Sequence, residues 1–200
     1  MAKYAFIDVQ NTDITTKKLL GFAVDWQKLY NFLKDSWNCN KVFLYIGVDE
    51  GDIDTTKMLE KLEKDGCVVR SKTVFAYKNK DKDLKVVCPD CRKEFIEHID
   101  MGYNRKSNCD VDLTVDAMEM AEAGNEFYIF TGDGDFAYLI KKVSGKGAKV
   151  HIVSNSKKIQ SGPRYYFSRF STKLRKLVSD NPNLVDFINI DNIRFRIQKQ

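Results

Sequence analysis

The sequence predicts an α/β fold with a mainly parallel central sheet, and two observations support this prediction. Short apolar runs rich in β-branched and aromatic residues alternate with segments whose apolar residues recur at helical spacing. Alternation of strand and helix is typical of parallel sheets, because right-handed crossovers place the connecting helices on both faces of the sheet. We therefore expect three layers, with helices on either side of the strands.

The expected strands are short, and they occupy residues 3–9, 41–48, 67–77, 126–131 and 148–153. Apolar side chains recur every three or four positions in the expected helices, which occupy residues 25–37, 54–65, 109–123 and 136–144. Asp25 is the N-cap of the first helix, and Gly66 and Gly124 end the second and third. Beyond Ser154 we expect a turn, an aromatic and basic stretch, a further helix and a closing strand.

The chain has 200 residues, which suits one domain. We expect that domain to span residues 1–156, with a charged insert at about residues 78–106, and residues 157–200 to pack on it. The segment 157–200 holds ten basic and three acidic residues, so the preceding residues carry about −2 of the total charge of +5. A basic segment on a near-neutral body fits a polyanionic partner, and a solvated basic surface explains the charge equally well.

Several classes of protein are excluded by composition. No apolar run approaches the roughly 18–20 residues of a membrane-spanning helix, so no membrane partner is expected. Asp8 comes too early for a signal peptide, and the cytoplasm is therefore the expected location. Five cysteines at irregular spacing argue against a disulfide framework.

Aspartates gather where strands are expected to end. Asp8 ends the first strand, and Asp133 and Asp135 directly follow the fourth. Ligands bind at this edge in open parallel sheets. On a helical wheel, Asp110 lies at a helix start but faces the packed side, whereas Asp116 lies near the boundary with solvent. A simple N-cap explains Asp110 alone, but its coincidence with the other aspartates favours a functional role.

A divalent cation is the expected partner of these carboxylates. Several carboxylates in one cleft repel each other and lose their hydration. Oxygen ligands suit Mg²⁺ or Mn²⁺, which can activate water and neutralise charge on a phosphodiester. A single aspartate beside glycine also makes ordinary turns, so the prediction depends on the whole set.

Three segments of the chain look familiar: residues 6–11 (FIDVQN), 110–117 (DVDLTVDA) and 131–136 (TGDGDF). They resemble, in the same order, the motifs of the NYN domain family, the LabA-like (DUF88) branch of the PIN-like nuclease superfamily. The resemblance spans residues 3–153 and implies a three-layer PIN-like (Rossmannoid) fold and RNA cleavage with Mg²⁺ or Mn²⁺. The chain departs from the family at Val9, where glycine is frequent, and at Cys109, where a small aliphatic residue is usual.

The resemblance also implies roles for individual residues. Four aspartates would bind the metal or orient the attacking water: Asp8, Asp110, Asp133 and Asp135. Asn11 would support the first aspartate or contact the scissile phosphate. Asp116 matches a recurrent acid of the family, although the helical wheel places it at the boundary.

Cys88 and Cys91 have the C-x-x-C spacing of half a zinc ribbon. A structural zinc site needs four ligands, and His98 is a candidate third ligand. Cys109 is a candidate fourth, although a buried core position suits it better. The ligands can also be shared across a homodimer. The alternatives are a reduced, unligated pair in a loop or a redox pair.

A nuclease cleft needs cations for phosphates and aromatic faces for unstacked bases. Candidate contacts close to the motifs are Tyr103, Arg105 and Lys106, and a second aromatic and basic cluster in the C-terminal segment consists of Arg164, Tyr165, Tyr166 and Arg169. The aromatic side chains fit a core equally well.

The sequence thus predicts a metal-dependent endonuclease that acts on RNA. The alternative is a non-catalytic RNA- or protein-binding module on the same fold, which the loss of a core aspartate would favour; none is missing here. A phosphatase of the haloacid dehalogenase type is rejected, because Asp8 is followed by Val9-Gln10 where that class needs Asp-x-Asp.

Overall fold

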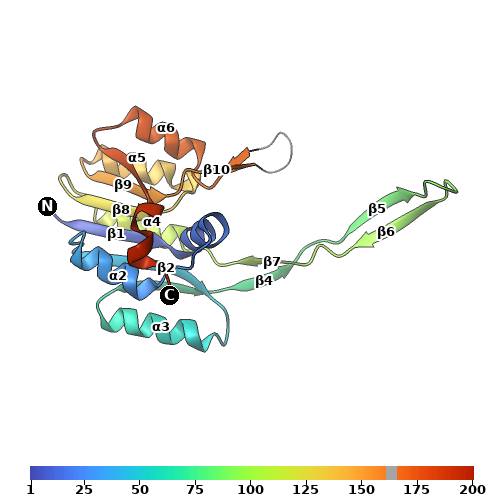
Figure 1. Cartoon of the computed structure of the whole chain (residues 1–200), viewed down its shortest axis with the longest axis horizontal. Coiled ribbons are helices and arrows are strands. Elements are labelled where there is room, and N and C mark those ends of the chain that lie inside the picture. The colour runs from blue at the N-terminus through green and yellow to red at the C-terminus, as the bar shows by residue number, and fades with distance from the viewer. Residues whose placement is uncertain (161–165) are drawn as a thin grey trace.

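A six-stranded sheet forms the centre of the molecule (Figure 1). The computed structural model describes residues 1–160 and 166–200. The strands, in spatial order, are β12 (Val185–Asn189), β9 (Lys149–Ser154), β8 (Glu126–Phe130), β1 (Lys3–Asp8), β2 (Lys41–Val48) and β3 (Val68–Thr73). Every neighbouring pair is parallel, which confirms the predicted fold class. From β1 the chain adds β2 and β3 on one side, and it then returns to add β8, β9 and β12 on the other side. The order of the strands therefore reverses between β1 and β8, and ligands of open parallel sheets bind at such a point.

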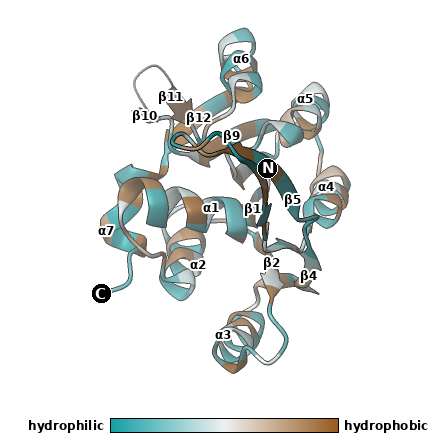
Figure 2. Cartoon of the chain, turned by 90° about the vertical axis from the view of Figure 1, so that its right-hand side faces the viewer, coloured by the Kyte–Doolittle hydropathy of each residue, from teal (hydrophilic) through white to brown (hydrophobic). Residues whose placement is uncertain are grey.

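Helices cover both faces of the sheet, as the two groups on opposite sides of the strands in Figure 2 show. One face is covered by α2 (Trp26–Asp35), α3 (Ile53–Lys64) and α7 (Arg194–Ile197), and the other by α4 (Asp110–Glu119), α5 (Ala137–Gly145) and α6 (Thr172–Asp180).

Successive side chains of β1 contribute alternately to two hydrophobic cores, one on each face of the sheet. Ile7 packs in the core that contains Leu29 of α2, and Phe6 packs in the core that contains Leu113 of α4. Successive strand residues point to opposite faces, so each helical layer has its own buried set.

Two helical segments directly after β1 were not expected. The strand ends at Asp8, one residue before the predicted limit, and α1 (Val9–Ile14) and a π-helical segment (Thr15–Leu20) follow. The Asp8 side chain accepts a hydrogen bond from the backbone amide of Asn11, so Asp8 is the N-cap of α1.

A single strand over residues 67–77 was also expected, and this prediction is wrong. The strand breaks at Val74, where the chain leaves the parallel sheet and enters an antiparallel ladder. There β4 (Phe75–Lys78) pairs with β7 (Tyr103–Lys106), and β5 (Lys82–Val87) pairs with β6 (Glu94–Ile99). We call residues 75–106 the arm, and Figure 1 shows it projecting far from the sheet.

The C-terminal segment completes the domain. It supplies the edge strand β12, the helices α6 and α7, the small antiparallel pair β10 (Lys158–Gln160) and β11 (Tyr166–Ser168), and a 3₁₀ turn (Ile190–Ile193). A second 3₁₀ turn (Gly134–Phe136) precedes α5. Within residues 1–160 and 166–200, no helix is long and apolar enough to cross a membrane.

Candidate functional site

A cavity of about 610 Å³ opens at the carboxyl edge of the sheet, where β1, β2 and β8 end. It is lined by residues from the ends of strands and the starts of helices. Five of the residues predicted from the sequence lie in its wall: Asp8, Asn11, Asp110, Asp133 and Asp135.

Asp8 is the most enclosed of these carboxylates. Its Oδ1 accepts a hydrogen bond from the Asn11 amide at 3.0 Å, and its Oδ2 accepts one from the Thr131 hydroxyl at 3.5 Å. Burial raises the pKa of Asp8 to about 6, and the negative charges of Asp110 and Asp133 add to the rise. A cation bound beside this carboxylate would favour its ionised form and lower its pKa again.

The loop after β8 is held by close backbone contacts. The Asn11 side-chain oxygen accepts a hydrogen bond from the Gly132 amide at 2.8 Å, and the Ser171 amide donates to the Gly132 carbonyl at 2.9 Å. A Cβ on Gly132 would lie 2.1 Å from the Arg169 carbonyl oxygen, so only glycine fits. This contact ties the C-terminal segment to the loop and brings Arg169 to the cavity wall.

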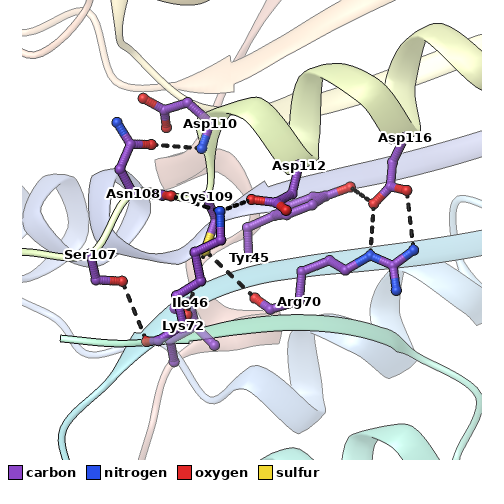
Figure 3. Close-up of polar contacts among 10 residues, drawn as sticks. All are labelled: Tyr45, Ile46, Arg70, Lys72, Ser107, Asn108, Cys109, Asp110, Asp112 and Asp116. Atoms are coloured by element: carbon purple, nitrogen blue, oxygen red, sulfur yellow. Dashed lines mark hydrogen bonds and ion pairs between the residues drawn. The ribbon is translucent and has the colours of Figure 1, made fainter.

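Asp110 is the first residue of α4, but it does not cap the helix. The Asn108 side-chain oxygen accepts the hydrogen bond from the Asp110 amide at 2.7 Å. The Asp110 carboxylate is therefore not used as a cap, and in Figure 3 it points away from Arg70 and Lys72. Burial raises its pKa, and the charges of the aspartates after β8 contribute.

Asp116 does not lie in the cavity wall. Its carboxylate accepts hydrogen bonds from the Tyr45 hydroxyl at 2.9 Å and from two nitrogens of Arg70 at 3.1 and 3.2 Å (Figure 3). Asp112, one turn earlier, pairs with Lys72 near the surface. The geometry gives Asp116 a structural role that ties α4 to β2 and β3.

Tyr45 and Asn108 also line the wall and were not selected from the sequence, whereas Arg169, which lines it too, belongs to the aromatic and basic cluster of candidate substrate contacts. Asn108 had a local signal, because a polar residue often precedes a helix start. The position of Arg169 depends on the contact with Gly132. No local sequence pattern predicts that contact.

The structure describes the side chains of only some of the predicted substrate contacts. Tyr103 is 66% exposed on β7, so it is not part of the core. Arg105 and Lys106 follow on the same strand, and their side chains lie outside the described part of the chain, as do Arg164 and Tyr165 altogether.

The structure keeps two of the candidate zinc ligands, His98 and Cys109, away from the cysteine pair. Cys88 and Cys91 lie at the tip of the arm, whereas His98 lies along β6 with its Nδ1 2.6 Å from an Asp83 oxygen. Cys109 is buried at the base of α4, where its Sγ is 3.7 Å from the Ile46 carbonyl oxygen. Among the described residues, no three His, Cys, Asp or Glu side chains form a ready-made metal-binding group.

Comparisons with known proteins agree with this fold. The family model for the NYN domain matches residues 4–172. A crystal structure of a protein of unknown function from Vibrio parahaemolyticus is similar, with a TM-score of 0.62 and 17% identity over 99% of this chain and 96% of that one. Phosphofructokinase-2 from Escherichia coli aligns with a TM-score of only 0.33 at 12% identity, over 57% of this chain and 37% of that one. A comparison with curated proteins gives no match.

Proposed function

The chain belongs to the NYN domain family of PIN-like nucleases, and on that premise we propose that it is a metal-dependent endoribonuclease. The family supports a nuclease role in general. The observation that carries the finer proposal is the set of aspartates that line one cavity from three separate elements: Asp8, Asp110, Asp133 and Asp135.

The charges of this set favour a divalent cation. Within the described residues, Asp8, Asp110 and Asp133 form no ion pair with lysine or arginine, whereas Asp135 lies 3.8 Å from the Lys173 ammonium. The carboxylates surround a cavity and do not form a closed cage. Mg²⁺ suits such a site, because it keeps several waters and commonly uses only one or two protein carboxylates together with substrate phosphates.

A bound Mg²⁺ or Mn²⁺ would supply Lewis-acid activation of water and neutralise charge on the scissile phosphodiester. The residues of the chain position the reactants around it. Asp8 is oriented by the hydrogen bonds from the Asn11 amide and the Thr131 hydroxyl, so it can supply one oxygen ligand. Asp135 is mostly exposed and can accept a hydrogen bond from the attacking water. The Arg169 guanidinium can pair with a phosphate of the bound strand.

RNA is the proposed substrate, and the base of the arm supports a single-stranded region of it. Ser107, which follows β7, lines the cavity. Phe75 lies beside Ser107, and Tyr77 and Tyr103 lie further along the β4–β7 pair. These three aromatic residues are 60%, 60% and 66% exposed. Exposed aromatic faces stack on unpaired bases in a sequence-tolerant way. We further propose a cytoplasmic location, because all five cysteines are free thiols.

Cleavage of labelled single-stranded and structured RNA, with Mn²⁺ or Mg²⁺ against EDTA, tests the proposal. Asp8→Asn and Asp110→Asn should each lower the rate by at least about 100-fold, because each removes a ligand charge. Asp112→Asn is the matched control, since it makes the same change two residues along the same helix but outside the cavity. Its rate should stay within about threefold of the unchanged protein.

Two results would contradict the enzyme. RNA binding without cleavage in every metal would leave a non-catalytic binding module on this fold. Cleavage that persists in both Asp8→Asn and Asp110→Asn would place the active site elsewhere or reveal a contaminating nuclease.

A further inference from the structure

The tip of the arm has the backbone geometry of a metal-binding knuckle. The Cys88 amide donates to the Lys93 carbonyl at 3.0 Å, and the Arg92 amide donates to the Cys88 carbonyl at 2.9 Å. Arg92 has a φ of 57°, in the left-handed region that residues other than glycine rarely adopt. The chain therefore turns back tightly around the segment Cys88-Pro89-Asp90-Cys91.

This turn places two cysteines at the same end of the arm. Cys88 and Cys91 both lie in the turn that joins β5 to β6, three residues apart. Cys88 is partly exposed and Cys91 is exposed, so both are accessible. Two cysteines held in this way can bind the same tetrahedral metal ion.

The chain supplies only half of such a site. His98 lies on β6 opposite Asp83. It is four residues from Glu94, the paired residue nearest the turn, and four residues of a strand span about 13 Å. Cys109 is buried in the body. Structural zinc has four protein ligands, so two ligands have to come from another molecule.

Apolar side chains on one face of the arm, beside the knuckle, are also exposed to solvent. In this ladder, paired residues share a face, and one face carries Val86 with Phe95 and Leu84 with Glu97. Leu84 is 48% exposed and Phe95 is 50% exposed. An isolated two-stranded hairpin is marginally stable in water, and packing on its apolar face would stabilise it.

We propose that the knuckle is half of a structural zinc site that the same two cysteines of a second copy complete, so that two chains are joined at the tips of their arms. A second copy is the fitting partner because it supplies the two missing ligands in a two-fold arrangement. It also offers an identical apolar face to pack against that of Leu84 and Phe95. The inference goes beyond the nuclease and does not depend on it.

Zinc content and molar mass in solution test the proposal together. We expect about one zinc per two chains, as four cysteines bind one ion. Light scattering should give a mass near twice 23.1 kDa. A strong chelator, Cys88→Ser and Cys91→Ser should each remove the zinc and give a monomer whose body remains folded by circular dichroism.

A matched variant separates this site from a site within one chain. His98→Gln should keep both the zinc and the dimer, because His98 lies away from the knuckle. Three outcomes would overturn the proposal. They are one zinc per monomer, a zinc-free monomer with a Cys88–Cys91 disulfide, and a dimer that survives the chelator and both serine variants.

Discussion

The body and the arm use similar residues with opposite results. Phe6 and Phe127 in the central sheet are fully buried, whereas Phe75 and Phe95 in the arm are 60% and 50% exposed. All four lie in strands. Helical layers cover the sheet on both faces, but the arm consists of two successive two-stranded antiparallel pairs without a covering layer from the described residues. Strand-forming residues therefore pair into strands in both regions, but their side chains are buried in a core only in the body, where helices pack on the sheet.

The largest expected effect contrasts two aromatic residues. Phe127→Ala should lower the free energy of unfolding by about 3–5 kcal/mol, because it leaves a cavity between β8 and its helices. Phe95→Ala, measured in chelator to keep the chain monomeric, should cost about 0.5 kcal/mol or less. Urea unfolding followed by tryptophan fluorescence measures both. Equal losses would show that the arm packs on the body.

A smaller effect concerns Asp8 and its pH dependence. The pKa of Asp8 rises from 3.8 to about 6 on folding, chiefly through burial, so its ionisation opposes folding. The penalty is absent below about pH 4, grows between the two pKa values and is complete above about pH 6. In EDTA at pH 7.5, Asp8→Asn should therefore raise the free energy of unfolding by on the order of 1–3 kcal/mol.

This gain should disappear near pH 4 and shrink in saturating Mg²⁺, which stabilises only the unchanged protein. Asp135→Asn is the control, because its side chain is 81% exposed and should alter stability little at any pH. A loss of stability in Asp8→Asn at pH 7.5 would mean that the hydrogen bonds of Asp8 outweigh its burial.

Next in size is the tie between α4 and the sheet. Asp116→Asn should lower the free energy of unfolding by about 1–2 kcal/mol, because it weakens the hydrogen bonds from Tyr45 and Arg70. Asp112→Asn should cost about 0.5 kcal/mol or less, since its pair with Lys72 is near the surface. RNA cleavage by folded Asp116→Asn should stay within about tenfold of normal, and a larger loss at full stability would return Asp116 to the active site.

The smallest effect is expected at the tip of the arm. Arg92→Gly should stabilise the turn by up to about 1 kcal/mol, because glycine adopts the left-handed conformation without strain. Hydrogen exchange of the β5 and β6 amides should slow accordingly in the monomer. Lys93→Gly, the neighbouring change at a position without positive φ, should speed it. No difference between the two variants would mean that the turn does not limit the stability of the arm.

The sequence was most informative where the pattern is local. Four expected strands correspond to β1, β2, β8 and β9, the expected strand 67–77 is divided between β3 and β4, and the helices around Leu29, Leu113 and Ile140 followed from the spacing of their apolar residues. The helical segments after Asp8 were missed, because the apolar pattern there is weak and the N-cap is itself a site residue. The break at Val74 was missed because β3 and β4 have the same strand propensity.

By itself, the sequence determined the fold class, the three motifs and the set of candidate aspartates, because strand ends and helix starts are encoded by neighbouring residues. Only the tertiary structure decided which acids share the cavity. It separated Asp110 from Asp116, which lie on the same helix, and carried Arg169 to the wall through its contact with Gly132. It also placed His98 and Cys109 away from the knuckle. These outcomes depend on contacts between residues far apart in the chain, which composition and spacing do not specify.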